Sequence, residues 1–216
     1  SRDKDIISSV AAPFSKEGGI TLLEGNLGRS IIKTSALKEE HLYVKAPAMV
    51  FSTQDELKDA FKKGLLDKDF VAVVKYQGPK ANGMPELHGL LPSLGVLQDK
   101  GYKVAIVTDG RMSGASGKVP SAIHLVEEAA KGGNIALIED VDIICIEVKN
   151  GKLNLEIPSE EKIRRQIKKA DLSANHANYG RNLFSMVRAN ISTAEEGATI
   201  FDIIGKDKIV HAQAVG

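Results

Sequence analysis

Two near-continuous apolar runs stand out in the hydrophobic pattern of the chain. Residues 70–74 (FVAVV) and 104–107 (VAIV) are rich in β-branched side chains and contain no polar position. This pattern is typical of strands that are covered on both faces. We therefore expect the two segments to pair at the centre of a sheet.

Shorter apolar stretches predict further strands on both sides of this pair. They occupy residues 20–23, 31–34, 135–138 and 143–148. A glycine turn at Gly25 to Gly28 separates the first two of these strands. Asn150–Gly151 is the favoured two-residue turn of a hairpin that leads into the alternating pattern of residues 153–157. The second half of the chain therefore predicts a β-meander.

Helical spacing is clearest in residues 53–66. Thr53 and Glu56 form a capping box, and apolar residues recur at helical spacing after it. Residues 85–99 also follow a helical pattern, but Pro92 interrupts it. We therefore expect two short helical pieces there rather than one helix.

Two more helices are expected towards the C-terminus. Ser159 can cap a helix whose first turn is acidic and whose later positions are basic, namely Arg164, Arg165, Lys168 and Lys169. We interpret this basic cluster as a solvated helical face. The last helix is expected around residues 181–188.

The expected elements define a fold class and a domain plan. About seven or eight short strands and three or four helices, joined by both crossovers and hairpins, fit neither a regular βαβ wind nor a pure sandwich. We expect a mixed α/β fold, a compact β-barrel-like sheet with flanking helices. Residues 1–19 are interpreted as a linker or arm, residues 20–205 as one domain, and residues 206–216 as a polar tail.

Length, charge and cysteine content narrow the classes of function. In 216 residues, 29 Lys and Arg balance 28 Asp and Glu, so the chain offers no broad basic field for nucleic acid or an anionic membrane. No apolar stretch approaches the ~20 residues that span a bilayer. The charged N-terminus lacks the apolar stretch of a signal peptide, and one cysteine cannot form an intrachain disulfide. We therefore expect a cytoplasmic protein without nucleic-acid or membrane partners.

The single cysteine also limits cofactor chemistry. Cys145 lies among isoleucines and is expected to pack as a buried thiol. An iron–sulfur cluster or a structural zinc site needs several thiolates or imidazoles, which this chain cannot supply. The five histidines are scattered, and no pair has helical ligand spacing.

Two glycine-rich loops follow the two buried strands. We name them the first loop (Gly78 to His88) and the second loop (Thr108 to Lys118). Their glycines permit positive φ and close backbone approach, and loops at adjacent strand ends can converge into an anion-binding concavity. The simpler alternative is two long turns. Turns need Gly and Asn, however, and do not explain the gathering of Lys80, Glu86, Arg111, Ser113 and Lys118.

The second loop does not match the common nucleotide-binding motifs. A Walker A motif needs glycine five residues before its Gly-Lys pair and Ser or Thr after it, but Met112 and Val119 occupy these positions. Gly110, Gly114 and Gly117 have the wrong intervals for a dinucleotide fingerprint. A smaller anion is the better expectation.

Several motifs in order resemble the C-terminal domain of the dihydroxy-acid and phosphogluconate dehydratase family. They are residues 25–29 (GNLGR), 78–88, 108–117 and 118–124 (KVPSAIH), and the resemblance covers roughly residues 13 to 202. Residues 79–88 and 113–121 are most similar to the phosphogluconate branch of the family. The resemblance implies a swivelling β/β/α fold and identifies residues 20–205 as a C-terminal dehydratase domain.

The same resemblance implies a reaction and roles for two residues. Members of this branch dehydrate 6-phosphogluconate to 2-keto-3-deoxy-6-phosphogluconate in the Entner–Doudoroff route. Ser113 matches the family's proposed acceptor of the C2 proton, an alkoxide that Arg111, a metal ion and backbone N–H groups would stabilise. Glu86 matches the carboxylate that this domain contributes to a magnesium site. The alternatives are a turn hydroxyl for Ser113 and a helix-start carboxylate for Glu86.

Charge and hydroxyl groups suggest further substrate contacts, and the family resemblance implies partners. Arg111, Lys80, Lys118, Ser116 and Ser121 are candidates for binding the substrate, the last four for its phosphate because of their charge or hydroxyl groups. His88 and His124 are assigned to packing or supporting roles. The family's iron–sulfur cluster would be held by an N-terminal domain absent from this chain, so we expect the chain alone to be inactive. The complete enzyme is expected to be a homodimer.

Two other functions stay open. The chain could belong to another sugar-acid or dihydroxy-acid dehydratase of the family. It could also be a non-catalytic domain that binds sugar phosphates or mediates assembly.

Overall fold

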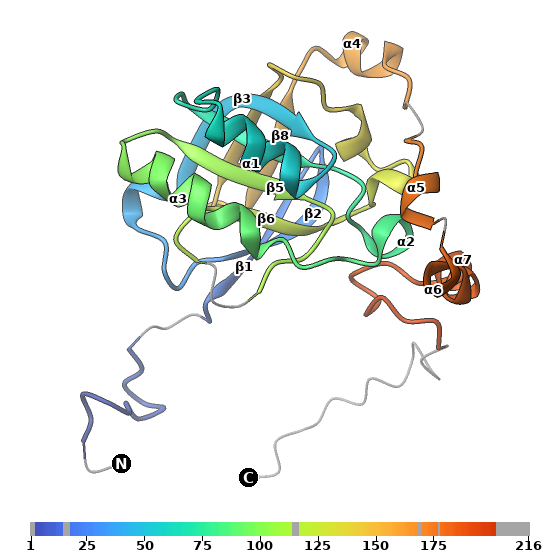
Figure 1. Cartoon of the computed structure of the whole chain (residues 1–216). Helices are drawn as coiled ribbons and strands as arrows, with labels where there is room; N and C mark the ends of the chain where they lie inside the picture. The colour runs from blue at the N-terminus through green and yellow to red at the C-terminus, as the bar shows by residue number, and fades with distance from the viewer. Residues whose placement is uncertain (1–2, 15–17, 114–116, 168–169, 177, 202–216) are drawn as a thin grey trace.

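The computed structural model describes residues 3–14, 18–113, 117–167, 170–176 and 178–201 (Figure 1). The strands are β1 (Ile20–Gly25), β2 (Gly28–Lys33), β3 (Tyr43–Phe51), β4 (Phe70–Val74), β5 (Val104–Thr108), β6 (Ser121–Val126), β7 (Ile143–Glu147) and β8 (Lys152–Glu156). The α-helices are α1 (Gln54–Lys62), α2 (Pro79–Asn82), α3 (Leu91–Asp99), α4 (Ser159–Arg164), α5 (Ser173–His176), α6 (Tyr179–Leu183) and α7 (Ser185–Asn190). Short 3-10 helices are η1 (Glu39–His41), η2 (His88–Leu90), η3 (Ala129–Lys131) and η4 (Asn134–Leu137).

The strands form a closed barrel in the order β1-β2-β6-β5-β4-β3-β7-β8. The four neighbours β3, β4, β5 and β6 run parallel to one another. Antiparallel pairs complete the wall, and a parallel contact between Glu24 of β1 and Lys152 of β8 closes it. The expected barrel-like α/β fold is confirmed, as is the pairing of residues 70–74 with residues 104–107.

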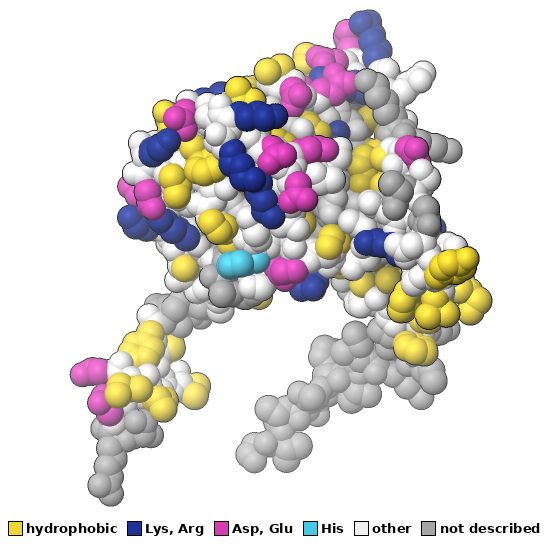
Figure 2. All heavy atoms as spheres, in the orientation of Figure 1, with side chains coloured by type: hydrophobic (Ala, Val, Ile, Leu, Met, Phe, Trp, Pro, Cys, Tyr) yellow, Lys and Arg dark blue, Asp and Glu magenta, His cyan; other side chains and the backbone are white. Residues whose placement is uncertain are grey.

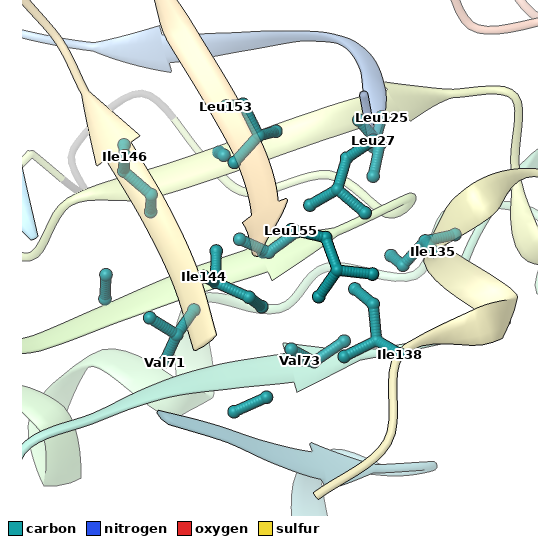
Figure 3. Packing of buried hydrophobic residues seen from close by; sticks show 14 of the residues in the cluster. Leu27, Val71, Val73, Leu125, Ile135, Ile138, Ile144, Ile146, Leu153 and Leu155 are labelled. Atoms are coloured by element: carbon teal, nitrogen blue, oxygen red, sulfur yellow. The ribbon is translucent and has the colours of Figure 1, made fainter. Parts of the chain in front are cut away.

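Strand alternation separates the buried apolar residues into two cores. Val71 and Val73 of β4 point into the barrel, where they pack with residues such as Ile144 and Leu155 (Figure 3). The other residues of β4 join the second core, on the outer face of the barrel. All five residues of β4 are therefore buried, which accounts for the uninterrupted apolar run in the sequence.

Helices α1 and α3 cover this outer face (Figure 1). Leu57 of α1 and Leu94 of α3 are fully buried against β4 and β5. The hydroxyl of Thr53 accepts the N–H of Glu56 at 3.2 Å and caps α1, as the capping box predicts. The helix ends at Lys62 rather than at residue 66, because Gly64 adopts a left-handed conformation with φ +69°.

Several local predictions were wrong in type or extent. Residues 135–138 are not a strand: the 3-10 helix η4 covers Asn134–Leu137. Pro92 does not break a helix. It lies in the first turn of α3, where its missing N–H costs nothing. The two short helical pieces expected in residues 85–99 are nevertheless present, as η2 and α3. The β7–β8 hairpin turn has four residues instead of two, since Glu147 pairs with Lys152.

The C-terminal predictions also need correction. Ser159 is the first residue of α4, and Pro158 precedes it without a side-chain cap. The helix ends at Arg164, so Arg165 is not on a solvated helical face: it turns inward to a buried ion pair with Asp142. The expected helix over residues 181–188 is two short helices, α6 and α7. Lys168, Lys169 and the predicted tail, residues 206–216, lie outside the described residues.

In the part of the chain that the structure describes, no helix has both the length and the apolar character that crossing a membrane requires.

Candidate active site

The two glycine-rich loops meet in space. Both leave the carboxyl ends of adjacent parallel strands, β4 and β5, so their first residues lie at the same edge of the sheet. Glu86 of the first loop forms a parallel β-bridge with Arg111 of the second, and Leu87 donates its N–H to the carbonyl of Arg111 at 3.2 Å. The convergence predicted from the sequence is thus present in the fold.

The Glu86 carboxylate lies at the centre of this meeting point. Its Oε2 accepts a hydrogen bond from the Arg111 guanidinium at 2.8 Å, within an ion pair. Its Oε1 accepts the backbone N–H of Ser113 at 2.8 Å and that of His88 at 3.0 Å. With donors from both loops, this carboxylate holds the two loops together. Because His88 is the first residue of η2, its bond to Glu86 also makes Glu86 a helix-start carboxylate. Glu86 therefore has both of the roles that the sequence left open, at the start of a helix and in the site.

Two further contacts fix the position of Glu86. Arg111 donates from Nε to the carbonyl of Met84 at 2.8 Å, so its guanidinium spans the first loop. Gln54 of α1 donates from Nε2 to the carbonyl of Glu86 at 2.9 Å. The first loop can take this path because Gly83 ends α2 in the left-handed region, with φ +71°.

Below the site lies a buried carboxylate that the sequence analysis missed. Asp109, the residue after β5, is fully buried and accepts the N–H groups of Gln77 at 2.8 Å and Ala129 at 2.9 Å. Burial raises its pKa from 3.8 to about 6, against the opposing effect of these hydrogen bonds. Asp109 therefore joins the start of the second loop to Gln77, the residue before the first loop, and to the start of η3. The sequence signal was its place directly after a buried strand.

Glu128 supports the first loop from β6. It is buried, and its carboxylate accepts the N–H groups of Lys80 at 2.9 Å and Ala81 at 3.2 Å, which begin α2. Burial raises the pKa of Glu128 as well. Gly78 precedes α2 because a Cβ there would lie 2.2 Å from Glu128 Oε2.

Two cationic or basic side chains near Ser113 were not assigned to the site from the sequence. Lys33, the last residue of β2, donates from Nζ to the carbonyls of Met112 at 2.9 Å and Ser113 at 2.6 Å. Burial lowers the pKa of His124 on β6, and the charges of Lys33 and Arg111 lower it further, so the imidazole is held neutral. Charge around Ser113 is thus mainly positive, apart from Glu86.

The remaining substrate-binding candidates do not converge on Glu86 in any described contact. Lys118 forms an ion pair with Asp99 at 2.6 Å, beside a cavity of about 310 Å³ between α3 and the second loop. Ser121 is buried, and its hydroxyl donates to the carbonyl of Val119 at 2.9 Å. Lys80 lies in α2, beside Glu128. Ser116 lies outside the described residues.

The side chains present can supply one ligand to a magnesium ion but not a whole site. In the described residues, no three His, Cys, Asp or Glu side chains gather closely enough to hold a metal ion. Glu86 fits the role of a single ligand, because Mg²⁺ prefers carboxylate oxygens and this side chain is 36% exposed. Arg111 occupies its Oε2, so a bound metal ion and the guanidinium would share this carboxylate.

An iron–sulfur cluster does not fit the residues of this chain. Cys145, on β7, is buried as predicted, and burial raises the pKa of its thiol, which opposes formation of the thiolate that ligates iron. Such a cluster needs several thiolates, and the chain has one cysteine.

Comparison with known proteins gives the family. The sequence model described as dihydroxy-acid/6-phosphogluconate dehydratase C-terminal matches residues 5–198. The chain belongs to this family. The family resemblance of the two loops is therefore confirmed. The match begins at residue 5, within residues 1–19, which the sequence analysis interpreted as a linker or arm.

Individual dehydratases agree with this assignment. Phosphogluconate dehydratase of Escherichia coli (strain K12) is 52% identical over 199 residues, which are 92% of this chain and 33% of the relative. That of Helicobacter pylori (strain 26695) is 52% identical over 209 residues, 94% of this chain and 34% of the relative. Dihydroxy-acid dehydratase of Archaeoglobus fulgidus is 39% identical over 202 residues, 92% of this chain and 36% of the relative. The chain spans about a third of the length of these relatives, so the relatives contain further regions that it does not match.

Proposed function

We propose that this chain is the C-terminal part of a cytoplasmic hydro-lyase that converts 6-phosphogluconate to 2-keto-3-deoxy-6-phosphogluconate, a step of the Entner–Doudoroff route. The names of the relatives that are 50–52% identical support this substrate. The observation that carries the proposal is the contact of one carboxylate, that of Glu86, with both Arg111 and the backbone of Ser113. It brings a candidate base and a candidate metal ligand into one site.

Ser113 is the proposed base. As an alkoxide, it takes the C2 proton of the substrate onto Oγ, and the electron pair left at C2 forms a C2–C3 double bond as the C3 oxygen leaves as hydroxide. The proton on Ser113 Oγ then passes to the hydroxide, which departs as water, and the alkoxide is restored. The resulting enol tautomerises to the 2-keto acid. Serine is too weakly acidic to ionise unaided at neutral pH, so its alkoxide requires nearby positive charge. Arg111 and Lys33 supply such charge on either side of Ser113.

Glu86 is the proposed magnesium ligand from this chain. A bound Mg²⁺ would supply positive charge that stabilises the anion formed when the C2 proton leaves. Arg111 orients the Glu86 carboxylate through their ion pair, and it is also placed to bind the substrate carboxylate. The remaining ligands and the iron–sulfur cluster would come from the rest of the enzyme.

The substrate phosphate is assigned to basic and hydroxyl groups around the two loops. Lys80, Lys118 and Ser116 are the proposed contacts. Ser121 belongs to the same initial set but is the least suited, because its hydroxyl is buried and already bonded to a carbonyl. Lys118 would have to leave Asp99 to reach a phosphate.

The proposed partner of the chain is the rest of the same enzyme. Helices α6 and α7 expose a group of large apolar side chains (Figure 2), namely Tyr179, Leu183, Phe184 and Met186. Soluble proteins seldom leave such a contiguous group uncovered. Since the relatives are about three times as long as this chain, their additional region is the occupant we propose for this surface. The complete enzyme is proposed to act as a homodimer.

Turnover measurements test this function. An enzyme whose C-terminal third is this chain should dehydrate 6-phosphogluconate, and the 216 residues alone should not. Gluconate and a branched 2,3-dihydroxy acid should be much poorer substrates. Preference for either would assign the chain to another branch of the family, and calorimetric binding of 6-phosphogluconate without turnover by the complete enzyme would favour a binding domain.

A further inference from the structure

The backbone of Ser113 is held on both sides by charged side chains. Glu86 accepts its N–H at 2.8 Å, and Lys33 donates to its carbonyl at 2.6 Å. Lys33 also bonds the preceding carbonyl, that of Met112, at 2.9 Å. The peptide groups on either side of Ser113 are therefore fixed.

Lys33 is well suited to this task by its place in the fold. It is the last residue of β2, whose neighbour in the barrel is β6, so it reaches the second loop from a rigid strand. The residue is half-buried, and it forms no ion pair with any carboxylate of the described ranges. Its positive charge is therefore not offset by a carboxylate of the described residues. It acts on the backbone carbonyls of Met112 and Ser113, which it contacts.

The charge of Lys33 lowers the pKa of a neighbouring side chain. His124, on the neighbouring strand β6, has a pKa lowered by burial and then by the charges of Lys33 and Arg111. The ammonium group thus acts electrostatically on His124 as well as bonding the backbone of the second loop. A neutral side chain of the same length would keep the packing but lose both the hydrogen bonds and this charge.

We propose that Lys33 is a positioning residue of the dehydration reaction, which holds Ser113 against Glu86 at the distance and orientation that transfer of the C2 proton requires. This inference rests on the proposed role of Ser113 as the base. Proton transfer depends steeply on the placement of the base, and a displacement of about 1 Å can cost roughly a hundredfold in rate. Lys33 need not touch the substrate to have this effect.

Three variants test the inference in the complete enzyme that carries this chain. Lys33→Met removes the hydrogen bonds and the charge, Lys33→Arg keeps both with a different geometry, and Lys45→Met is a matched control. Lys45 is also a strand lysine, but it pairs with Glu156 at 2.7 Å on β8, away from the two loops. The measurements are kcat and KM for 6-phosphogluconate and exchange of the C2 proton with solvent.

For Lys33→Met we expect kcat and C2 exchange to fall by about a hundredfold while KM changes by less than about threefold. Lys33→Arg should recover at least about tenfold of that loss, and Lys45→Met should match the wild type. If Lys33→Met fails to fold, Lys33→Leu takes its place, because it also removes the hydrogen bonds and the charge.

Two results would overturn the inference. One is a folded Lys33→Met or Lys33→Leu enzyme with kcat within about twofold of the wild type. The other is an Arg variant that recovers nothing although it folds. Failure of the proposed function itself is distinguishable, because it would show as an active Ser113→Ala enzyme or as a wild type that does not act on 6-phosphogluconate.

Discussion

The carboxylate of Glu86 accepts the backbone N–H of Ser113 at 2.8 Å, although the two residues belong to different loops and are 27 positions apart in sequence. This contact is possible because β4 and β5 are parallel neighbours whose carboxyl ends release both loops at one edge of the barrel. A change to either residue therefore alters the other loop as well as its own.

Replacing Glu86 by Gln should separate its charge from its shape. The amide oxygen can still accept one N–H, but the ion pair with Arg111 and the anionic metal ligand are lost. We expect kcat of the complete enzyme to fall at least about a hundredfold and the magnesium concentration for half-activation to rise. Steady-state kinetics over a magnesium titration measures both. Glu24→Gln, which removes an exposed carboxylate beside Arg29, is the control and should have little effect.

The buried carboxyl of Asp109 should impose a pH dependence on stability. Its pKa is about 6 in the folded protein against 3.8 ordinarily, so the folded protein binds this proton more tightly than the unfolded chain. The stabilisation is complete below about pH 4 and is lost as the pH rises through about 6, a change of about 3 kcal/mol.

An Asp109→Asn variant isolates this effect from other groups, including the nearby Glu128. Its free energy of unfolding, relative to that of the wild type, should increase between pH 4 and pH 7, because the wild type alone loses the contribution. Urea unfolding at a series of pH values gives the difference. A pH-independent difference between the two proteins would show that Asp109 titrates normally.

The buried ion pair between Arg165 and Asp142 should matter more than any surface pair. The two side chains are 12% and 7% exposed, and Arg165 NH2 lies 2.8 Å from Asp142 Oδ1. Asp142→Asn removes the buried partner, leaves the guanidinium with the exposed Glu161, and should cost about 3 kcal/mol of unfolding free energy. Asp67→Asn breaks the exposed pair with Lys100 and should cost less than about 1 kcal/mol in the same denaturation experiment. Equal costs would mean that the Arg165 pair is solvated.

Gly78 and Gly95 form a matched pair of glycine positions. A Cβ at Gly78 would lie 2.2 Å from Glu128 Oε2 and displace the carboxylate that holds the N–H groups at the start of α2. A Cβ at Gly95, within α3, would meet nothing within 4 Å. Gly78→Ala should therefore lower the thermal unfolding midpoint, whereas Gly95→Ala should leave it unchanged or raise it, since Ala favours helix by about 1 kcal/mol over Gly. Calorimetry that ranks the two variants in the opposite order would contradict this account of the first loop.

The elements that the sequence predicts well are those whose surroundings are uniform. Residues 70–74 are buried on both faces, so all five are apolar and the run predicts a central strand. Residues 135–138 form a similar run, but four buried apolar residues look the same in a short helix and in a strand. β3 has a weaker signal in the sequence, since its apolar residues are interrupted by Lys45 and by Pro47, which pairs with Ile143 there.

The site could be predicted in part for a similar reason. Glu86, Arg111 and Ser113 lie in loops whose glycines and charges stand out locally. Lys33 has no such signal, because it ends an ordinary strand and its partners are 79 and 80 positions away. The inward turn of Arg165 could not be predicted either. It is one basic residue among several, and the local sequence does not indicate its partner Asp142, 23 positions earlier.

The central claim is that Ser113, held by Glu86, accepts the C2 proton of 6-phosphogluconate. The direct measurement is incorporation of solvent deuterium at C2 by the complete enzyme, for the wild type and for Ser113→Ala. The account predicts that the wild type exchanges the C2 proton and that the variant, folded and with its cluster intact, does not. Exchange by Ser113→Ala at the wild-type rate would contradict it.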